Sequence, residues 1–325
     1  MSASYTDSED EGLGALLEEP EGYRPATPPP TVRSYKRRKY GGTGPLRGPP
    51  EVQVGLVSGH PLWGHILYPA AIALARFLEL HAPTLLHGAD GSKGKNKGKN
   101  VLELGAGGGL PGLVAALEGA GQVVISDFPD AALVKNLEQN VQLNIAPAAS
   151  ATDDIAETRA AGFTWGSSPD QLFATLAGSA GAKFDLILLS DLVFNHSQHA
   201  ALLKTCLTCL SPSSPSPPGP SSSRPTPATS TTRDGAESDE PAATVDLTTT
   251  TTDSRPVATP AVLCFFSHHR PKFVEADLGI ISLARELGWD VERVWHDPNA
   301  GPAFPEDAGD LSIRGTVHGY MFTRP

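Results

Sequence analysis

The chain has 325 residues and a formal net charge of −11, and its 33 glycines and 30 prolines are unevenly spread. No apolar run approaches the roughly 18 residues that cross a bilayer, and the acidic balance gives no general reason to expect nucleic-acid binding. The three cysteines, Cys206, Cys209 and Cys264, are too sparse for a disulfide framework, which favours reduced thiols in a cytoplasmic or nuclear protein.

Two regions have the composition of disordered polypeptide. Residues 1–50 are acidic and then basic, with few aliphatic side chains and no periodicity. Residues 211–259 contain ten Ser, eleven Thr and nine Pro, and no aromatic side chain. Such segments cannot bury enough apolar surface to offset the entropy lost on ordering. We therefore predict a disordered tail over 1–50 and one domain over 51–325, interrupted by a disordered insert over 211–259.

Helical and strand patterns alternate along the rest of the chain. We expect helices at residues 69–81, 110–119, 129–144, 196–210 and 272–288. We expect strands at residues 100–105, 122–127, 184–191, 261–269, 289–295 and 312–324, and a short one within the weakly patterned "AGFTWG" at 161–166. This alternation predicts an α/β fold, a mostly parallel sheet with helices on both faces. In such sheets a ligand lies at the carboxyl ends of the strands.

The stretch "VLELGAGGGLPGLVAAL" places a glycine cluster between the first of these strands and a helix. The dinucleotide fingerprint G-x-G-x-x-G fails here, because position 110 is Leu. The pattern E-x-G-x-G-x-G fits Glu103, Gly105, Gly107 and Gly109, and it is the one expected of S-adenosylmethionine enzymes. That cofactor has no phosphate and needs close backbone approach and a carboxylate, which Glu103 would supply directly or through water. The alternative is a tight turn that binds nothing.

Asp127 is the second candidate, at the end of the second strand and 22 residues after Gly105. A carboxylate at this position accepts hydrogen bonds from both ribose hydroxyls of a bound cofactor. The position serves a dinucleotide equally well, so it does not discriminate between the two cofactors. The competing interpretation is that Asp127 caps the following helix.

These motifs resemble the seven-β-strand lysine methyltransferases. The resemblance is carried by "PLWGHILYPAAIALARFLE", "VLELGAGGGLPGLVAAL", "ISDFP", "TWG" and "LILLSDLVFNH", while "FNHSQH" and "FFSHHRP" narrow it to the fungal branch once labelled nicotinamide N-methyltransferase-like. It covers residues 51–325 apart from the insert. It implies the class I S-adenosylmethionine-dependent methyltransferase fold, with a seven-stranded sheet. It also implies N-terminal and lysine methylation of translation elongation factor 1-alpha by a cytoplasmic monomer, with no metal, nucleic-acid or membrane partner.

The resemblance also implies which residues contact the cofactor. Trp63 of "LWGH" is similar to an upstream aromatic residue that touches it, and Trp165 of "TWG" to the residue beside the adenine. The remaining positions that match the family's cofactor contacts are Gly105, Ala106, Gly107, Asp127 and Ser190. Both tryptophans offer a flat apolar face, and an indole near a sulfonium gains by cation–π attraction. The alternative is that each is only a core residue.

Asp191 and Asn195 of "DLVFNH" are the expected substrate-facing residues. A protein amine is mostly protonated at pH 7 and must lose a proton before it attacks the methyl group. We expect Asp191 to orient the amine, Phe194 to form a wall, Asn195 to hydrogen-bond, and bulk water to take the proton.

Histidines and cysteines give weaker signals. His196, His268 and His269 are further candidates for the rim of the site. Neighbouring residues in a strand point to opposite faces, so we do not expect His268 and His269 to share a zinc ion. Cys206 and Cys209 form C-x-x-C inside a helical pattern, which favours packing over redox or metal chemistry.

Two rival functions remain open from the sequence. One is a small-molecule N-methyltransferase that acts on nicotinamide or a similar pyridine. The other is a non-catalytic module that binds the cofactor and a partner, against which the intact motif residues argue.

Overall fold

The computed structural model describes residues 30–39, 46–58, 65–177, 181–212 and 257–324. Trp63 lies outside these ranges, so its predicted contact with the cofactor stays a prediction. The central part of the expected insert, residues 213–256, also lies outside them.

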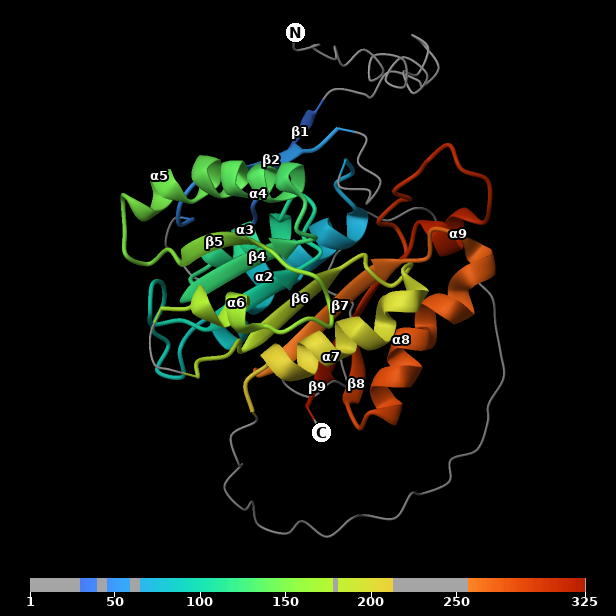
Figure 1. The fold of residues 1–325 in the computed structure, drawn as a ribbon. Helices are drawn as coiled ribbons and strands as arrows, with labels where there is room; N and C mark the ends of the chain where they lie inside the picture. Colours follow the sequence, from blue (N-terminus) through green and yellow to red (C-terminus); the bar gives the residue numbers. More distant parts are fainter. Residues whose placement is uncertain (1–29, 40–45, 59–64, 178–180, 213–256, 325) are drawn as a thin grey trace, which may run out of the picture.

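A seven-stranded sheet forms the centre of the molecule (Figure 1), in the order β5-β4-β3-β6-β7-β9-β8. Its strands are β3 (Asn100–Leu104), β4 (Gln122–Asp127), β5 (Glu157–Gly162), β6 (Leu186–Ser190), β7 (Ala261–Ser267), β8 (Asp290–Asp297) and β9 (Val317–Thr323). The pairs from β5 to β7 are parallel, and β9 is antiparallel to both of its neighbours. The chain runs outward from β3 to β5 and then returns to β6, so the strand order reverses between β3 and β6. This confirms the expected class I fold and places the switch point beside the glycine cluster.

Helices cover both faces of the sheet. The helices are α2 (Pro69–Leu85), α3 (Leu110–Leu117), α4 (Ala131–Asn144), α5 (Ala146–Ala149), α6 (Asp170–Ala174), α7 (His199–Cys209), α8 (Val274–Glu286) and α9 (Leu311–Arg314), with 3₁₀ turns η1 (His196–Gln198) and η2 (Pro271–Phe273). Leu186 and Leu188 of β6 pack into one core with α2 and α3, while Ile187 and Leu189 pack into the other with α7 and α8. This alternation explains why β6 reads as a continuous apolar run. Among the described helices, none combines the length and apolarity that a bilayer crossing requires.

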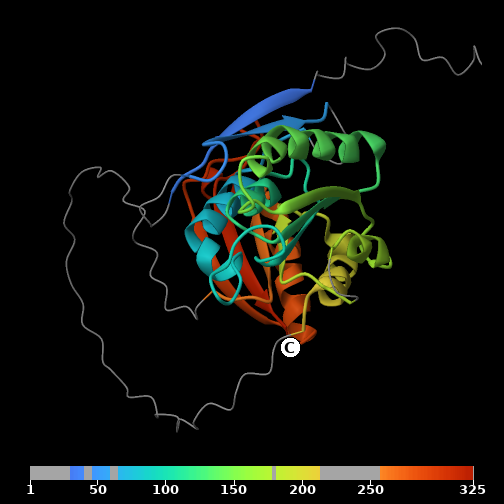
Figure 2. The same cartoon turned by 90° about the vertical axis from the view of Figure 1, so that its left-hand side faces the viewer.

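The expectation of a disordered tail over 1–50 is wrong for residues 31–36. They form β1 (Thr31–Lys36), which pairs antiparallel with β2 (Glu51–Leu56), and Figure 2 shows this hairpin beside α4. The Tyr35 hydroxyl donates to Glu79 Oε2 at 2.9 Å. The sequence pattern missed the strand because only Tyr35 of β1 is buried, so no apolar alternation marks it.

Three further boundaries differ from the expected ones. Strand β5 begins four residues before "AGFTWG". The expected final strand is shorter, because Asp310 caps the short helix α9 by accepting from the Ser312 N–H. The insert is narrower than 211–259. The N–H of Ser211 donates to the Phe184 carbonyl at 2.7 Å, and Val257 packs against the core.

Candidate active site

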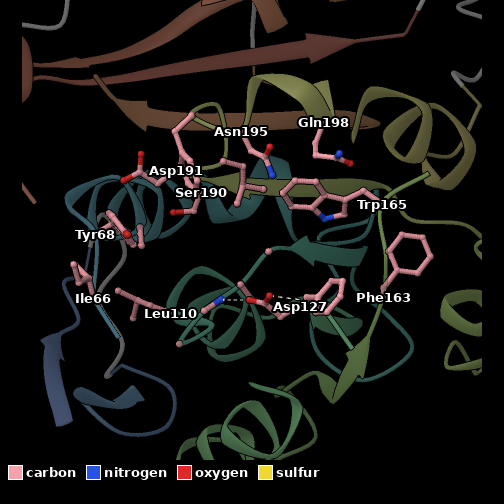
Figure 3. A pocket seen from close by; sticks show the side chains of 18 of the residues that line it. Ile66, Tyr68, Leu110, Asp127, Phe163, Trp165, Ser190, Asp191, Asn195 and Gln198 are labelled. Carbon is pink, nitrogen blue, oxygen red and sulfur yellow. Dashed lines mark hydrogen bonds between the residues drawn. The ribbon is translucent and has the colours of Figure 1, made fainter. Parts of the chain in front are cut away.

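A cavity of about 690 Å³ opens at the carboxyl ends of β3, β4 and β6 (Figure 3). Its walls include four segments that the sequence singled out, namely the glycine loop, Asp127, "TWG" and "SDLVFN", together with residues 66–68 and Ala71. Of the predicted site residues within the described ranges, it brings together Gly105, Ala106, Gly107, Asp127, Trp165, Ser190, Asp191 and Asn195. Residues far apart in the chain therefore meet because their strands end at the same edge of the sheet.

The glycines of the loop have two different roles. Gly105 has a φ of +61°, and a Cβ there would lie 2.6 Å from Leu192 Cδ2 and 3.0 Å from Trp165 Cζ2. Packing therefore requires glycine at this position. Gly107 has a φ of +56°, but a Cβ there would meet nothing within 4 Å. Gly107 thus leaves the backbone open to the cavity, as close approach of a ligand requires.

Asn140 of α4 supports the loop from behind, and the sequence analysis did not identify it. Its amide Nδ2 donates to the Gly108 carbonyl at 2.9 Å and to the Gly55 carbonyl at 2.8 Å. Its Oδ1 accepts from the Gly55 N–H at 2.9 Å. The side chain is almost fully buried and ties the β1–β2 hairpin to the glycine loop. The local sequence pattern gave no signal for this role, because it depends on contacts with residues distant in the chain.

The Asp127 carboxylate faces the cavity from the end of β4. Its Oδ2 accepts from the Gly107 N–H at 2.6 Å and its Oδ1 from the Phe128 N–H at 2.7 Å, as the dashed lines in Figure 3 show. A carboxylate has about four lone-pair positions, and Asp127 lines the cavity, so it can also accept hydrogen bonds from a ligand there. The alternative interpretation of Asp127 as a helix cap is wrong, because Asp130 caps α4.

Glu103 is not brought to the cavity. Its side chain is completely buried, and Oε2 accepts from the Gly112 N–H of α3 at 2.8 Å. Burial raises the pKa of Glu103 to about 8, although the hydrogen bond from Gly112 lowers it. The arrangement supports a role in joining α3 to β3 rather than a direct contact with a ligand. The E-x-G-x-G-x-G pattern cannot reveal on which face of the strand its carboxylate lies.

Trp165 both packs in the core and borders the cavity. It is partly buried against the α6–α7–α8 core, and its indole forms a wall of the cavity. Ser190, at the end of β6, lines the cavity beside Asp191. The two interpretations of this tryptophan, core residue and ligand face, are therefore compatible.

Asp191 has an unusual environment. Its φ is +60°, a left-handed conformation that is uncommon outside glycine, although Asp adopts it more readily than most residues. The side chain is 3% exposed. Its Oδ1 is 3.0 Å from His269 Nε2 and accepts from the Ser267 N–H, while Oδ2 has no hydrogen-bond partner among the described residues. A buried carboxylate oxygen without a partner is costly, so a hydrogen-bond donor from a ligand would stabilise it.

Tyr68 is the main functional candidate that the sequence analysis missed. It immediately precedes α2 and lines the same cavity. Burial, and next the charge of Asp191, raise the pKa of the Tyr68 hydroxyl. Figure 3 shows Tyr68, Ser190 and Asp191 together, across the cavity from Asp127. The signal in the sequence was its place before Pro69, at the start of a helix.

A second cavity of about 500 Å³ adjoins the first. Tyr68 and Phe194 line both, so they form the partition between them. Phe273 and Phe304 supply further aromatic walls of the second cavity. The two cavities together leave room for a ligand larger than a cofactor.

The three candidate histidines bind carboxylates. His196 Nε2 lies 2.7 Å from Asp277 Oδ1, and His268 Nδ1 lies 2.8 Å from Asp277 Oδ2. His269 instead reaches Asp191, so the neighbouring histidines are directed to different carboxylates. The expected strand faces are not the reason, because β7 ends at Ser267 and both histidines follow it. The described residues contain no group of three or more His, Cys, Asp or Glu side chains that would hold a metal ion.

The cysteines are packing residues. Cys206 and Cys209 are fully buried in the core between α7 and the sheet, and all three cysteines are free. Burial raises the pKa of the Cys209 and Cys264 thiols to about 12. Thiols of this kind are poor nucleophiles and metal ligands, in agreement with the expectation that the C-x-x-C pattern serves packing.

Comparisons with known proteins agree with this geometry. The signature of a family described as lysine methyltransferase matches residues 58–216. The chain is 34% identical to the "Protein N-terminal and lysine N-methyltransferase efm7" of Schizosaccharomyces pombe, with 98% of each chain covered. It is 34% identical to the protein of the same description from Candida glabrata, covering 98% of this chain and 99% of that one. With the Cryptococcus neoformans protein it shares 35% identity over 83% of this chain and 74% of the other.

Proposed function

The chain belongs to the lysine methyltransferase family, and from that premise we propose that it is an S-adenosylmethionine-dependent protein N-methyltransferase. Its proposed acceptor is the N-terminal amine, a nearby lysine, or both, of translation elongation factor 1-alpha. The related fungal proteins are described as acting on N-terminal and lysine amines, which supports this acceptor class.

The cofactor half of the proposal rests on the loop and Asp127. The open backbone at Gly107 and the Asp127 carboxylate on the cavity wall fit an adenosine whose ribose hydroxyls need acceptors. Trp165 offers the adjacent apolar face. Bound here, S-adenosylmethionine supplies an activated methyl group on a sulfonium.

The observation that supports an amine as the methyl acceptor is the Oδ2 of Asp191, which has no hydrogen-bond partner among the described residues. This oxygen belongs to a residue that lines the same cavity as the glycine loop. A charge-assisted hydrogen bond from an ammonium or amine would satisfy it and hold the nitrogen in place. Correct placement of the nucleophile is the main contribution a protein makes to this type of displacement. Asn195, on the same wall, offers a further hydrogen-bond partner.

The second cavity supports a polypeptide acceptor over a pyridine. A nicotinamide-sized molecule would fit within the first cavity, whereas a peptide needs room beyond the reacting amine. The second cavity provides that room directly behind Tyr68 and Phe194. We further propose a cytoplasmic monomer without nucleic-acid or membrane partners, a location with which three free, buried thiols agree.

The test is methyl transfer from S-adenosylmethionine with a deuterated methyl group to purified elongation factor 1-alpha, followed by mass spectrometry of its peptides. We expect mass increments on the N-terminal peptide, on a nearby lysine, or on both. Asp191→Asn should abolish most of the increment, while Asp153→Asn, an exposed carboxylate far from the cavity, serves as the matched control. Product on nicotinamide with none on the protein would favour the small-molecule rival. No product at all, with the cofactor bound, would favour the non-catalytic one.

A further inference from the structure

His269 and Asp191 form a hydrogen-bonded pair whose two members line different cavities. The Nε2 of His269 lies 3.0 Å from Asp191 Oδ1, and its ring lines the second cavity. Asp191 lines the first cavity, and its buried Oδ2 has no hydrogen-bond partner among the described residues. The Asp191–His269 pair therefore connects the walls of the two cavities beside Tyr68, because Asp191 lines the first cavity and His269 the second.

His269 is held firmly from behind. Its carbonyl accepts from Arg314 Nε at 3.3 Å, and the Arg314 side chain is almost completely buried. The same guanidinium donates to the carbonyls of Phe304 and Asp307. The His269 ring packs edge-on against Phe304, with centroids 5.4 Å apart, and at a tilt against Tyr68, at 5.5 Å. These contacts leave the imidazole little freedom to turn away from Asp191.

The charges around His269 favour its protonated form. Burial lowers the pKa of His269, but the charge of Asp191 and its hydrogen bond outweigh that effect, so the pKa is raised. Asp277 raises it further and Arg314 lowers it. The other charged or titratable side chains that line the same cavity are Tyr68, His196, Arg270 and Asp307.

We propose that His269 is a positioning residue that acts through Asp191: it holds Oδ1 so that Oδ2 stays directed at the acceptor amine. This inference rests on the proposed function. His269 takes no proton from the amine in this role, and it touches neither the cofactor nor the methyl group. Its charge strengthens a hydrogen bond that a neutral donor would also make, but more weakly.

Two substitutions separate the hydrogen bond from the charge. His269→Gln keeps an amide donor for Asp191 Oδ1 without the charge, and His269→Phe keeps a ring without a donor. Both should bind S-adenosylhomocysteine within about twofold of wild type, because the cofactor residues lie across the cavity. Single-turnover methyl transfer should fall roughly 100-fold in His269→Phe, as expected when a reacting group is misplaced, and much less in His269→Gln. His296→Gln, an exposed histidine on β8, is the matched control.

The pH dependence gives a readout that a purely structural role would not change. The wild-type rate divided by the His269→Gln rate should be about ten at pH 6 and should approach one at high pH. At high pH His269 is neutral, so histidine and glutamine at this position are both uncharged donors to Asp191. A ratio that is flat with pH, or a wild-type rate in His269→Phe, overturns the inference. If His269→Phe does not fold, the pH ratio of His269→Gln decides alone. Absence of transfer by wild type would count against the proposed function and this inference together, whereas an unaffected His269→Phe would count against the inference only.

Discussion

The cavity has two sides, each built around an aspartate at a strand end. Asp127 is partly exposed, and each of its oxygens accepts one backbone N–H, one of them from the glycine loop. Asp191 is buried, has a left-handed backbone and leaves one oxygen without a partner. The Asp127 side is held by contacts within the chain, whereas the Asp191 side is the one on which we propose that an amine binds.

This difference indicates an order of events and a division of labour. The Asp127 side is already shaped and should bind the cofactor without help from the acceptor. We propose that an amine bound on the Asp191 side offsets the cost of the unpaired carboxylate oxygen. Substitutions on the two sides should therefore affect different measurements.

The largest expected effect is on the Asp127 side. Asp127→Ala should weaken S-adenosylhomocysteine binding by roughly 2–4 kcal/mol, because two charge-assisted hydrogen bonds to the ligand and the brace on Gly107 are lost. Isothermal titration calorimetry measures this directly, with Asp153→Ala as the control. Unchanged affinity in Asp127→Ala would mean that the ribose lies elsewhere.

A smaller effect concerns Glu103, behind the glycine loop. Its pKa is about 8 in the folded chain, above the ordinary value of 4.5, so the folded state holds a proton that the unfolded state has released. The contribution of protonated Glu103 to the free energy of unfolding is fully present below pH 4.5 and is lost as the pH rises toward 8. Glu103→Gln, which stays neutral, should lose about 2 kcal/mol less unfolding free energy than wild type between pH 5 and 6.5. Urea unfolding at several pH values tests this, with the exposed Glu138→Gln as control. Parallel pH curves for Glu103→Gln and wild type would contradict it.

Gly107→Ala should have a smaller effect on stability and on cofactor binding than the two substitutions above. Open space surrounds the added methyl, so the cost is the left-handed backbone, about 1 kcal/mol of stability. Cofactor affinity should fall about tenfold, because the methyl group stands where the ligand approaches the backbone. Gly91→Ala is the matched control: it has a φ of +78°, equally open space and no place in the cavity. Equal cofactor affinity in the two variants would argue against close approach at Gly107.

Replacement of residues 213–256 should have the smallest effect on stability and on cofactor binding. The flanking Ser211 and Ala261 N–H groups bond to the neighbouring carbonyls of Phe184 and Asp185, so the two ends of the segment meet at one place. A Gly-Ser bridge of about 20 residues roughly halves the loop length, which changes the closure free energy by about 0.6 kcal/mol. Thermal unfolding and cofactor titration should both remain close to wild type. An insoluble variant would show that the replaced segment packs on the domain.

The sequence predicted most of the sheet and most of the residues around the cavity. Gly105, Gly107, Asp127 and Asp191 were identifiable because each lies in a contiguous motif at a strand end, and the topology of the fold brings strand ends together. Their roles as cofactor and acceptor contacts stay predictions. Motif membership also misled, since Glu103 fits the pattern but lies away from the cavity.

The remaining features depend on partners that are distant in the chain. Strand β1 has almost no apolar pattern and is held by its pairing with β2 and by the bond from Tyr35 to Glu79. Asn140 supports the glycine loop from 32 residues away, and His269 reaches Asp191 across 78 residues. Local periodicity contains no information about such contacts, so only the folded chain shows them.

The central claim is that Asp191 serves the acceptor and not the cofactor. The most direct test is single-turnover methyl transfer by Asp191→Asn with the cofactor saturating, combined with calorimetry of S-adenosylhomocysteine on the same protein. We expect cofactor affinity within about twofold of wild type and a transfer rate lower by roughly 100-fold, because Asn removes the charge that holds the amine. An Asp191→Asn variant that loses cofactor binding, or one that transfers methyl groups at the wild-type rate, would contradict the claim.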